Sequence, residues 1–389
     1  MGLSLVPSPA ARITASSAAP VAKIIAQSYN VPFKYISVGM PTEVVEIDGS
    51  YGEGGGSILR VATGLAAATG RAVRIVNIRA NRPRPGLAAQ HLTGLRTLTR
   101  LFDAETKGAE IGSTEVTFIP RRPRLRSLSV DVGTAGSISL VLQSVMIALS
   151  THQGDVSLEL TGGTHVRWAP NYDYLSNVTV PLLQRMGYHS EVRLERPGYY
   201  PKGGGKVSFR SVGATRLQPA AFERFGKLEA IYGVSRASNL PEHVAKRQAK
   251  SASEVLSRFT DPEIEIKVER SFSPGSSITV WAVTSEGCRL GASALGERGK
   301  PAEQVGREAG EEMAVYLRQE SPMDPYMLDQ LIPYCALAEG TSVLKASKLT
   351  KHAVTNVYVA SRIAGCSIDV EGELGEPCTI RIRGLGGTE

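Results

Sequence analysis

Cysteine is scarce in this sequence, and its positions are scattered. Four cysteines occur among 389 residues, and no two of them have the C-x-x-C spacing of a zinc knuckle or a redox pair. This scarcity argues against a disulfide framework and against a cysteine-based zinc site, and it is typical of proteins from a reducing compartment. We therefore expect a cytoplasmic protein. The four are Cys288, Cys335, Cys366 and Cys378.

Long apolar runs and an acidic excess are also missing. No apolar stretch approaches the roughly 20 residues of a membrane-spanning helix, so we expect a soluble protein without a membrane partner. Lysine and arginine total 44 against 37 aspartates and glutamates, which gives a formal net charge of +7. A basic balance of this kind favours an anionic partner, with nucleic acid as the first candidate.

Acidic residues are absent before Glu43. Residues 1–42 are rich in alanine and serine, and their only charged side chains are Arg12, Lys23 and Lys34. Three interpretations are open: an organellar targeting peptide, a poorly ordered leader, or a start assigned too early with Met40 as the real beginning. So few basic residues make a poor targeting signal, which favours the last two interpretations.

From Glu43 onward one order of elements is predicted three times: strand, helix, strand, helix, strand, strand. A recurring βαβαββ pattern of this kind indicates internal repeats. The first copy has expected elements at 44–48, 58–68, 74–79, 86–102, 109–112 and 114–119, and the second at 129–132, 137–148, 156–160, 170–186, 191–194 and 206–210. The third has a helix from 323, a strand at 341–346, a helix from 351, and strands at 367–370 and 379–383.

The third copy arrives late in the chain, and the surplus predicts an inserted unit. Residues 222–319 contain strand patterns at 227–234, 263–268 and 277–283 and helical patterns at 241–259 and 301–317. We therefore predict an α+β fold, in which a body of three repeats (43–221 and 320–389) carries a small α/β domain (222–319) between repeats 2 and 3.

A glycine-rich loop follows the first strand and contains one acidic residue. In Gly52–Ser57, consecutive glycines allow backbone N–H groups to approach phosphate oxygens closely. Glu53 is suited to hold Mg²⁺ or Mn²⁺, because a hard cation bound to nucleotide phosphates needs few protein carboxylates. A tight turn without a ligand is the alternative interpretation of the glycines.

His352 is predicted in the first turn of a helix that Thr350 caps. The positive end of the helix dipole favours a bound phosphate and a neutral imidazole, which a nitrogen nucleophile must have. The alternative is a histidine without a catalytic task, as most histidines are.

Two further groups of residues are suited to a nucleotide. Arginines of the segment 78–86, followed by Gln90 and His91, are suited to phosphate because the guanidinium group is a planar fork. Pro170, Tyr174 and Tyr326 are suited to form a slot for a purine, and Asp329 and Gln330 to bind a ribose. The alternatives are an aromatic core contact and a polar helix face.

Taken together, these motifs resemble the RNA 3′-terminal phosphate cyclases, from about Val44 to the C-terminus. The family fold is three βαβαββ repeats with an inserted α/β domain. The resemblance implies an ATP-dependent reaction with Mg²⁺ or Mn²⁺. In this reaction a histidine first binds AMP covalently and then transfers it to an RNA 3′-phosphate. Finally, the vicinal 2′-hydroxyl attacks and closes a 2′,3′-cyclic phosphate. The matching segments are Gly52–Arg60, Arg79–His91, Gly133–Gln143, Gly162–Thr164, Tyr199–Gly205, Tyr326–Gln330 and Lys351–Asn356.

The resemblance also implies roles for individual residues. His352 is similar to the nucleophile and Glu53 to the metal and triphosphate contact. Arg60, Arg79, Arg82 and Gln90 resemble the set that binds phosphate and RNA. The implied adenosine site consists of Gln143, Pro170, Tyr174, Tyr326, Met327, Leu328, Asp329 and Gln330. His165 departs from the pattern, since family members often have an acidic residue there.

Two other functions are alternatives to a catalytic cyclase. One is a non-catalytic, cyclase-like RNA-binding protein of ribosome biogenesis, but such relatives lack the histidine motif that is present here. The other is an enolpyruvyl transferase built on similar repeats, which would not require His352 and fits the basic charge less well. The sequence carries no signal for the oligomeric state.

Overall fold

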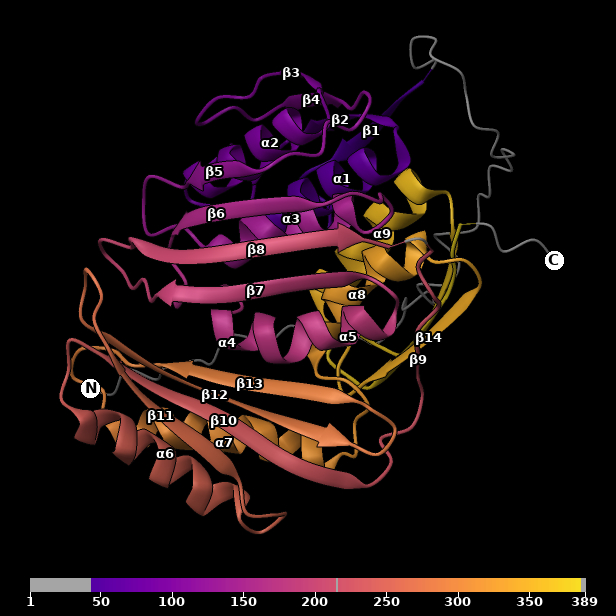
Figure 1. Cartoon of the computed structure of the whole chain (residues 1–389). Coiled ribbons are helices and arrows are strands. Elements are labelled where there is room, and N and C mark those ends of the chain that lie inside the picture. The colour runs from indigo at the N-terminus through magenta and orange to yellow at the C-terminus, as the bar shows by residue number, and fades with distance from the viewer. Residues whose placement is uncertain (1–42, 215, 386–389) are drawn as a thin grey trace, which may run out of the picture.

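The computed structural model describes residues 43–214 and 216–385, and it shows four mixed four-stranded sheets with helices packed against them (Figure 1). This confirms the predicted α+β class. The segment predicted as a leader or mis-assigned start, residues 1–42, lies outside the described residues.

The first sheet contains β1 (Val44–Asp48), β2 (Ala72–Val76), β3 (Glu105–Lys107) and β4 (Val116–Ile119), in the order β1-β2-β4-β3. Strand β1 runs parallel to β2, whereas β4 is antiparallel to both of its neighbours. Helix α1 (Gly56–Thr69) connects β1 to β2, and α2 (Ala89–Leu101) follows β2. The parallel pair requires a crossover, and α1 provides it.

The second sheet contains β5 (Leu128–Asp131), β6 (Val156–Gly162), β7 (His189–Arg196) and β8 (Gly205–Gly213), in the order β5-β6-β8-β7. Helix α3 (Ile138–Leu149) connects β5 to β6. Between β6 and β7 the chain forms α4 (Tyr172–Tyr174), a π-helical turn (Leu175–Thr179) and α5 (Val180–Arg185).

The third sheet contains β9 (Ala221–Phe222), β14 (Thr341–Ala346), β15 (Ser367–Glu371) and β16 (Cys378–Arg383), in the order β15-β16-β14-β9. Helices α8 (Pro325–Leu337) and α9 (Lys351–Ala364) flank β14 in the chain. Counted from its first strand in sequence, each of these three sheets has the order first, second, fourth, third.

The fourth sheet contains β10 (Leu228–Ser238), β11 (Glu263–Glu269), β12 (Gly275–Thr284) and β13 (Arg289–Leu295), in the order β11-β10-β12-β13. Helices α6 (Glu242–Leu256) and α7 (Ala302–Arg318) cover one of its faces (Figure 1). The α4 and π-helical segment contacts β12 and β13.

Some local predictions were wrong. Residues 109–112, predicted as a strand, form a turn, and the edge strand of that sheet is the polar β3 instead. The predicted strand 74–79 ends at Val76, because Asn77 and Arg79 have positive φ angles of 53° and 55° that are incompatible with a strand. The predicted helix 170–186 is interrupted by the π-helical turn. Strand β13 was not predicted.

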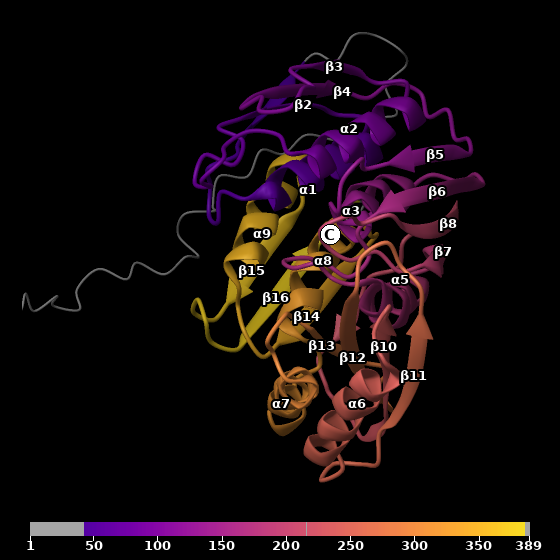
Figure 2. The same cartoon turned by 90° about the vertical axis from the view of Figure 1, so that its left-hand side faces the viewer.

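Helix α1 lies at the centre of the body and determines where the site forms. Its apolar face is buried, and it packs against α2, α3 and α9. A Cβ atom on Gly64 would lie 2.9 Å from Cβ of Ile147, so this glycine allows a close approach of α1 to α3. Figure 2 shows α1, α8 and α9 next to one another. No helix of the described residues has the length and apolar character needed to cross a membrane.

Candidate active site

The glycine-rich loop before α1 meets the first turn of α9. Oε2 of Glu53 lies 2.7 Å from Nε2 of His352, and the Glu53 backbone N–H donates to Oγ1 of Thr355 over 3.4 Å. Gly52 has a φ angle of +62°, and a Cβ atom there would lie 2.3 Å from Thr355 Oγ1. The glycine is therefore required both for the turn and for the close approach of α9.

Helix α9 begins where the sequence predicts. The Thr350 side chain accepts a hydrogen bond from the Ala353 N–H over 2.9 Å, and Gly365 ends the helix in the left-handed conformation. His352 lies in the first turn, as predicted. Helix α1 begins at Gly56 without a side-chain cap, so the N-termini of α1 and α9 both present backbone N–H groups near Glu53 and His352. Two such ends together favour a bound anion.

The contact with Glu53 affects the pKa of His352. A hydrogen bond with Glu53 raises the pKa of His352, and this outweighs the opposing effect of burial; the nearby Asp329 raises it further. The same contact with His352 lowers the pKa of Glu53. The prediction of a neutral imidazole considered only the helix dipole, whereas a carboxylate in contact with the ring favours its protonated form.

Glu53 also has the properties of a ligand for a divalent cation. Its Oε2 atom is buried and accepts no aligned hydrogen bond from the described residues, although His352 Nε2 is close. No three histidine, cysteine, aspartate or glutamate side chains of the described residues gather as a metal-binding cluster. A single carboxylate fits Mg²⁺ or Mn²⁺ when nucleotide phosphates and water supply the other ligands.

Two arginines of the predicted phosphate set lie around Glu53. Arg82 contacts the Glu53 carboxylate directly. Arg60 Nε donates to Oε1 of Gln143 over 2.7 Å, so Gln143 holds a phosphate-binding candidate in place. Desolvation lowers the pKa of Arg60 to about 10, against the attraction of Asp329 and Glu53, and the guanidinium group therefore remains charged at neutral pH.

Arg79 and Gln90 lie on either side of the start of α2. Arg79 Nη1 donates to the Gly86 carbonyl over 2.7 Å, and burial lowers the pKa of Arg79. Gln90 Oε1 accepts a hydrogen bond from the Ser137 N–H over 3.0 Å. Gln90 thus connects α2 to the glycine loop before α3.

The Tyr326–Gln330 segment presents only part of its side chains to solvent. Tyr326 is 52% exposed and Asp329 is partly exposed, but Met327 and Leu328 are fully buried in the core. Gln330 is buried and bonds to Thr179 Oγ1 and to the Tyr326 carbonyl. Burial raises the pKa of Asp329 to about 7, against the effects of His352 and Arg60. Tyr326 and Asp329 are therefore the members of this segment whose side chains are not fully buried.

Tyr174 lies in the core rather than on an open wall. It is 3% exposed, and its hydroxyl donates to the carboxylate of Asp324 at 2.9 and 3.0 Å from the two oxygens. The Gly291 N–H donates to the same carboxylate over 2.9 Å. This placement favours the alternative interpretation of Tyr174, an aromatic core contact. Pro170 is partly exposed, and its carbonyl accepts a hydrogen bond from Ser139 Oγ.

Comparison with known proteins agrees with this arrangement. Residues 51–370 match the family described as RNA 3′-terminal phosphate cyclase. The chain belongs to this family. Archaeal relatives called RNA 3′-terminal phosphate cyclase are similar over almost their whole length: 47% identity over 350 residues for Methanopyrus kandleri (88% of this chain, 99% of the relative) and 49% over 342 residues for Thermococcus gammatolerans (87% and 98%).

Among solved structures, the enolpyruvyl transferase NikO from Streptomyces tendae matches with a TM-score of 0.37 and 14% sequence identity, over 89% of this chain and 49% of that one. This structural similarity is too weak to support a conclusion about this protein.

Two residues of the matching segments, His91 and Asn356, build the site in ways that the sequence did not predict. His91 is buried against Gly56, where a Cβ atom would lie 2.2 Å from its Nε2; burial, together with Arg60 and Arg79, lowers the pKa of His91 to about 3, so the ring is neutral. Asn356 joins three helices, since its Oδ1 accepts from Ser57 Oγ over 3.1 Å and its Nδ2 donates to the Asp329 carbonyl over 2.8 Å. Its place in the matching segment Lys351–Asn356, one turn after His352, is the sequence signal for this role.

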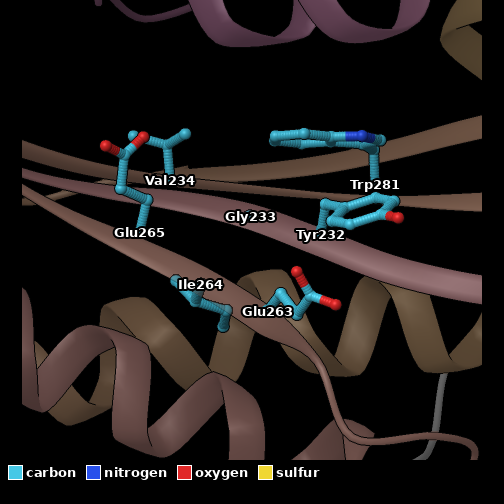
Figure 3. A pocket seen from close by; sticks show the side chains of 7 residues that line it. All are labelled: Tyr232, Gly233, Val234, Glu263, Ile264, Glu265 and Trp281. Carbon is cyan, nitrogen blue, oxygen red and sulfur yellow. The ribbon is translucent and has the colours of Figure 1, made fainter.

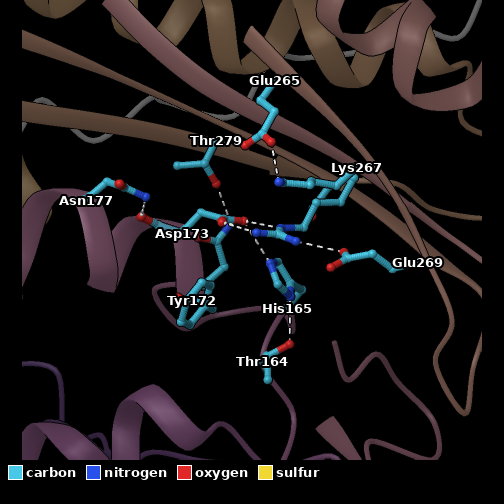
Figure 4. A network of polar contacts seen from close by, with 12 residues as sticks. Thr164, His165, Tyr172, Asp173, Asn177, Glu265, Lys267, Glu269 and Thr279 are labelled. Carbon is cyan, nitrogen blue, oxygen red and sulfur yellow. Dashed lines mark hydrogen bonds and ion pairs between the residues drawn. The ribbon is translucent and has the colours of Figure 1, made fainter. Parts of the chain in front are cut away.

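His165, where the chain departs from the family pattern, belongs to a buried polar network (Figure 4). Its Nε2 lies 3.0 Å from Oδ2 of Asp173, and Arg236 bonds to both oxygens of Asp173 at 2.7 and 2.8 Å. Arg236 also bonds to Glu269 over 2.7 Å. Because Arg236 is on β10 and Glu269 on β11, the network joins the loop after β6 to the fourth sheet.

A hollow of about 490 Å³ lies on the fourth sheet (Figure 3). Tyr232, Val234 and Trp281 line it together with the carboxylates Glu263 and Glu265. Its lining contains no histidine and no cation, so it does not suit the binding of nucleotide phosphates as the His352 region does.

Proposed function

We propose that this protein converts an RNA 3′-phosphate into a 2′,3′-cyclic phosphodiester with ATP, through a covalent bond between His352 and AMP. The observation that carries the proposal is the contact of His352 with Glu53 at the converging N-termini of α1 and α9, with Arg60 and Arg82 beside it. Membership of the RNA 3′-terminal phosphate cyclase family supports the same reaction.

In the first step the His352 imidazole attacks the α-phosphorus of ATP. A phosphorus–nitrogen bond forms, the bond from the α-phosphorus to the bridging oxygen breaks, and diphosphate leaves. The attacking nitrogen must first lose its proton, and Glu53 Oε2, 2.7 Å from Nε2, is placed to accept it. Arg60, Arg82 and the helix N-termini stabilise the negative charge of the departing diphosphate.

In the second step an oxygen of the RNA 3′-phosphate attacks the same phosphorus and displaces the imidazole, giving a mixed anhydride of RNA and AMP. In the third step the vicinal 2′-hydroxyl attacks the terminal RNA phosphorus, closes the ring and releases AMP. The role of the chain here is to orient phosphates, and Arg79 and Gln90 are the proposed contacts for the RNA end.

Glu53 is the proposed ligand of Mg²⁺ or Mn²⁺, which would supply positive charge to the triphosphate. For the adenosine we propose contacts with Tyr326, Asp329, Pro170 and Gln143. Four other residues of the predicted adenosine site have buried side chains, and we propose that they support the site without contacting the adenosine. They are Met327, Leu328, Gln330 and Tyr174.

We also propose that the body consists of three βαβαββ repeats, and the shared strand order of three sheets supports this division. The body would comprise 43–221 and 320–389, with 222–319 as the inserted domain. The pairing of Phe222 with Leu344 supports a start of the insert directly after β9, one residue later than this boundary. The four unpaired cysteines suit the proposed cytoplasmic location.

The test is incubation of the protein with α-labelled ATP and Mg²⁺ or Mn²⁺. We expect label that stays on the protein in alkali, is lost in acid, and is absent in His352→Ala. A second assay follows conversion of a 3′-phosphorylated RNA to a product that phosphatase cannot dephosphorylate. A wild-type protein that takes up no label but binds RNA would support the non-catalytic, cyclase-like alternative instead.

A further inference from the structure

Three aromatic side chains on adjoining loops are exposed to solvent. Trp168, Tyr200 and Phe272 are 92%, 79% and 54% exposed. Here these three residues are called the aromatic loop cluster. Large apolar side chains gathered at a surface mark a binding site more often than isolated ones do.

The three loops are bonded into one unit. The backbone N–H groups of Thr164 and His165 donate to the Gly198 carbonyl over 2.9 and 3.2 Å, which ties the Trp168 loop to the Tyr200 loop. The Lys202 N–H donates to Ser273 Oγ over 3.0 Å, which ties the Tyr200 loop to the Phe272 loop. The loops that carry the three rings are therefore held next to one another.

Two basic residues, Arg196 and Lys202, lie on the same loops or contact these rings. The guanidinium carbon of Arg196 lies 4.1 Å from the centroid of the Phe272 ring, and Arg196 Nε donates to the Gly204 carbonyl over 2.9 Å. Lys202, between Tyr200 and the Phe272 contact, is exposed. Exposed aromatic faces interleaved with cations bind single-stranded nucleic acid, because bases stack on the rings while the cations attract the phosphates.

The cluster is continuous with the proposed RNA contacts. A Cβ atom on Gly203 would lie 2.8 Å from Cα of Ala135, so the Tyr200 loop packs directly on the glycine loop before α3. Two residues further along that loop, the Ser137 N–H donates to Gln90. A chain of packed loops thus leads from Gln90, at the proposed site of the RNA phosphate, to the exposed rings.

We propose that the aromatic loop cluster, with Arg196 and Lys202, binds the single-stranded RNA immediately 5′ of the terminal phosphate by stacking its bases on Trp168, Tyr200 and Phe272. This proposal rests on the proposed function, since it takes the position of the RNA end from it. Recognition of this kind is tolerant of sequence, because every base has a face that stacks.

The test compares the affinities for two single-stranded 3′-phosphorylated RNAs, one of about twelve nucleotides and one a dinucleotide. We expect Trp168→Ala, Tyr200→Ala and Phe272→Ala each to weaken binding of the longer RNA about tenfold and to leave the dinucleotide unaffected. Tyr200→Phe should retain the wild-type affinity, because the ring still stacks. Leu374→Ala is the matched control, since Leu374 is 54% exposed in the connection between β15 and β16.

Self-labelling with ATP, measured on the same proteins without RNA, separates the two proposals. Unchanged affinity of all three alanine variants for the longer RNA would overturn the inference, and so would an equal loss for the dinucleotide. Conversely, a wild-type protein that takes up no label, but whose affinity for the longer RNA falls in the three variants, would support the RNA surface and refute the catalytic proposal.

Discussion

The 2.7 Å contact between Nε2 of His352 and Oε2 of Glu53 joins the third sheet's helix α9 to the loop that opens α1. These residues are far apart in the sequence, and each lies near the N-terminus of a helix. Because a carboxylate in contact with the ring favours its protonated form, this contact raises the pKa of His352. In the proposed mechanism His352 attacks as the neutral imidazole, and Glu53 accepts the proton that it loses.

The first prediction concerns His352 itself. His352→Ala should abolish label uptake from α-labelled ATP, because no other side chain replaces the nucleophile, while thermal unfolding stays close to that of the wild type. His243→Ala, which removes an exposed histidine on α6, is the control and should label normally. Label retained in His352→Ala would show that another residue carries the nucleotide.

The second prediction concerns Glu53. Glu53→Gln keeps the shape of the side chain but removes its charge, so we expect metal-dependent labelling to fall by roughly a hundredfold with little change in folding. Label uptake across a Mg²⁺ and Mn²⁺ titration measures the effect. Glu46→Gln, in an exposed pair with Arg74, is the control. An identical metal titration in Glu53→Gln and wild type would remove Glu53 from the site.

The third prediction distinguishes the two interpretations of Tyr174, a wall of the base site and an aromatic core contact. Its hydroxyl donates to Asp324, which also caps α8. Tyr174→Phe should therefore lower the free energy of unfolding by about 1–2 kcal/mol and leave the affinity for ATP unchanged. Urea denaturation and nucleotide titration measure these quantities. Loss of ATP affinity without loss of stability would return Tyr174 to the wall of the base site.

The predicted helices and strands matched the structure best where a capping residue or a run of β-branched residues marked them. The Thr350 cap fixed the start of α9, and the β-branched run fixed β14 at Thr341–Ala346. Strand β13 was missed because Arg289–Leu295 is rich in glycine, alanine and serine, which are not typical of strands. The π-helical turn was missed because its apolar pattern is the same as that of an α-helix.

At the site, the single residues were predictable but most of their contacts were not. His352 and Glu53 were identified from local motifs, whereas their mutual contact depends on how α1 and α9 pack. Met327 and Leu328 belong to a matching segment, yet their side chains are turned into the core, since helical periodicity directs neighbours to different faces. The network around Asp173 depends on Arg236, which comes from a separate sheet.

The last prediction concerns Arg236 and the pH dependence of stability. Burial raises the pKa of Asp173, but hydrogen bonds from Arg236 and His165 outweigh it and lower this pKa to about 2. A carboxyl with a lower pKa in the folded than in the unfolded chain contributes stability above its ordinary pKa of 3.8, and that stability is lost as the pH falls toward 2.

Arg236→Met leaves Asp173 buried without its main partner, so at neutral pH it should lower the free energy of unfolding by about 3–5 kcal/mol. The difference between wild type and variant should shrink as the pH falls below 3.8, because protonated Asp173 no longer needs the guanidinium group. Urea denaturation at several pH values measures both effects. Arg210→Met breaks an exposed pair with Asp155 and should cost less than about 1 kcal/mol. A difference for Arg236→Met that stays constant, or grows as the pH falls, would show that the charge of Asp173 is not what Arg236 stabilises.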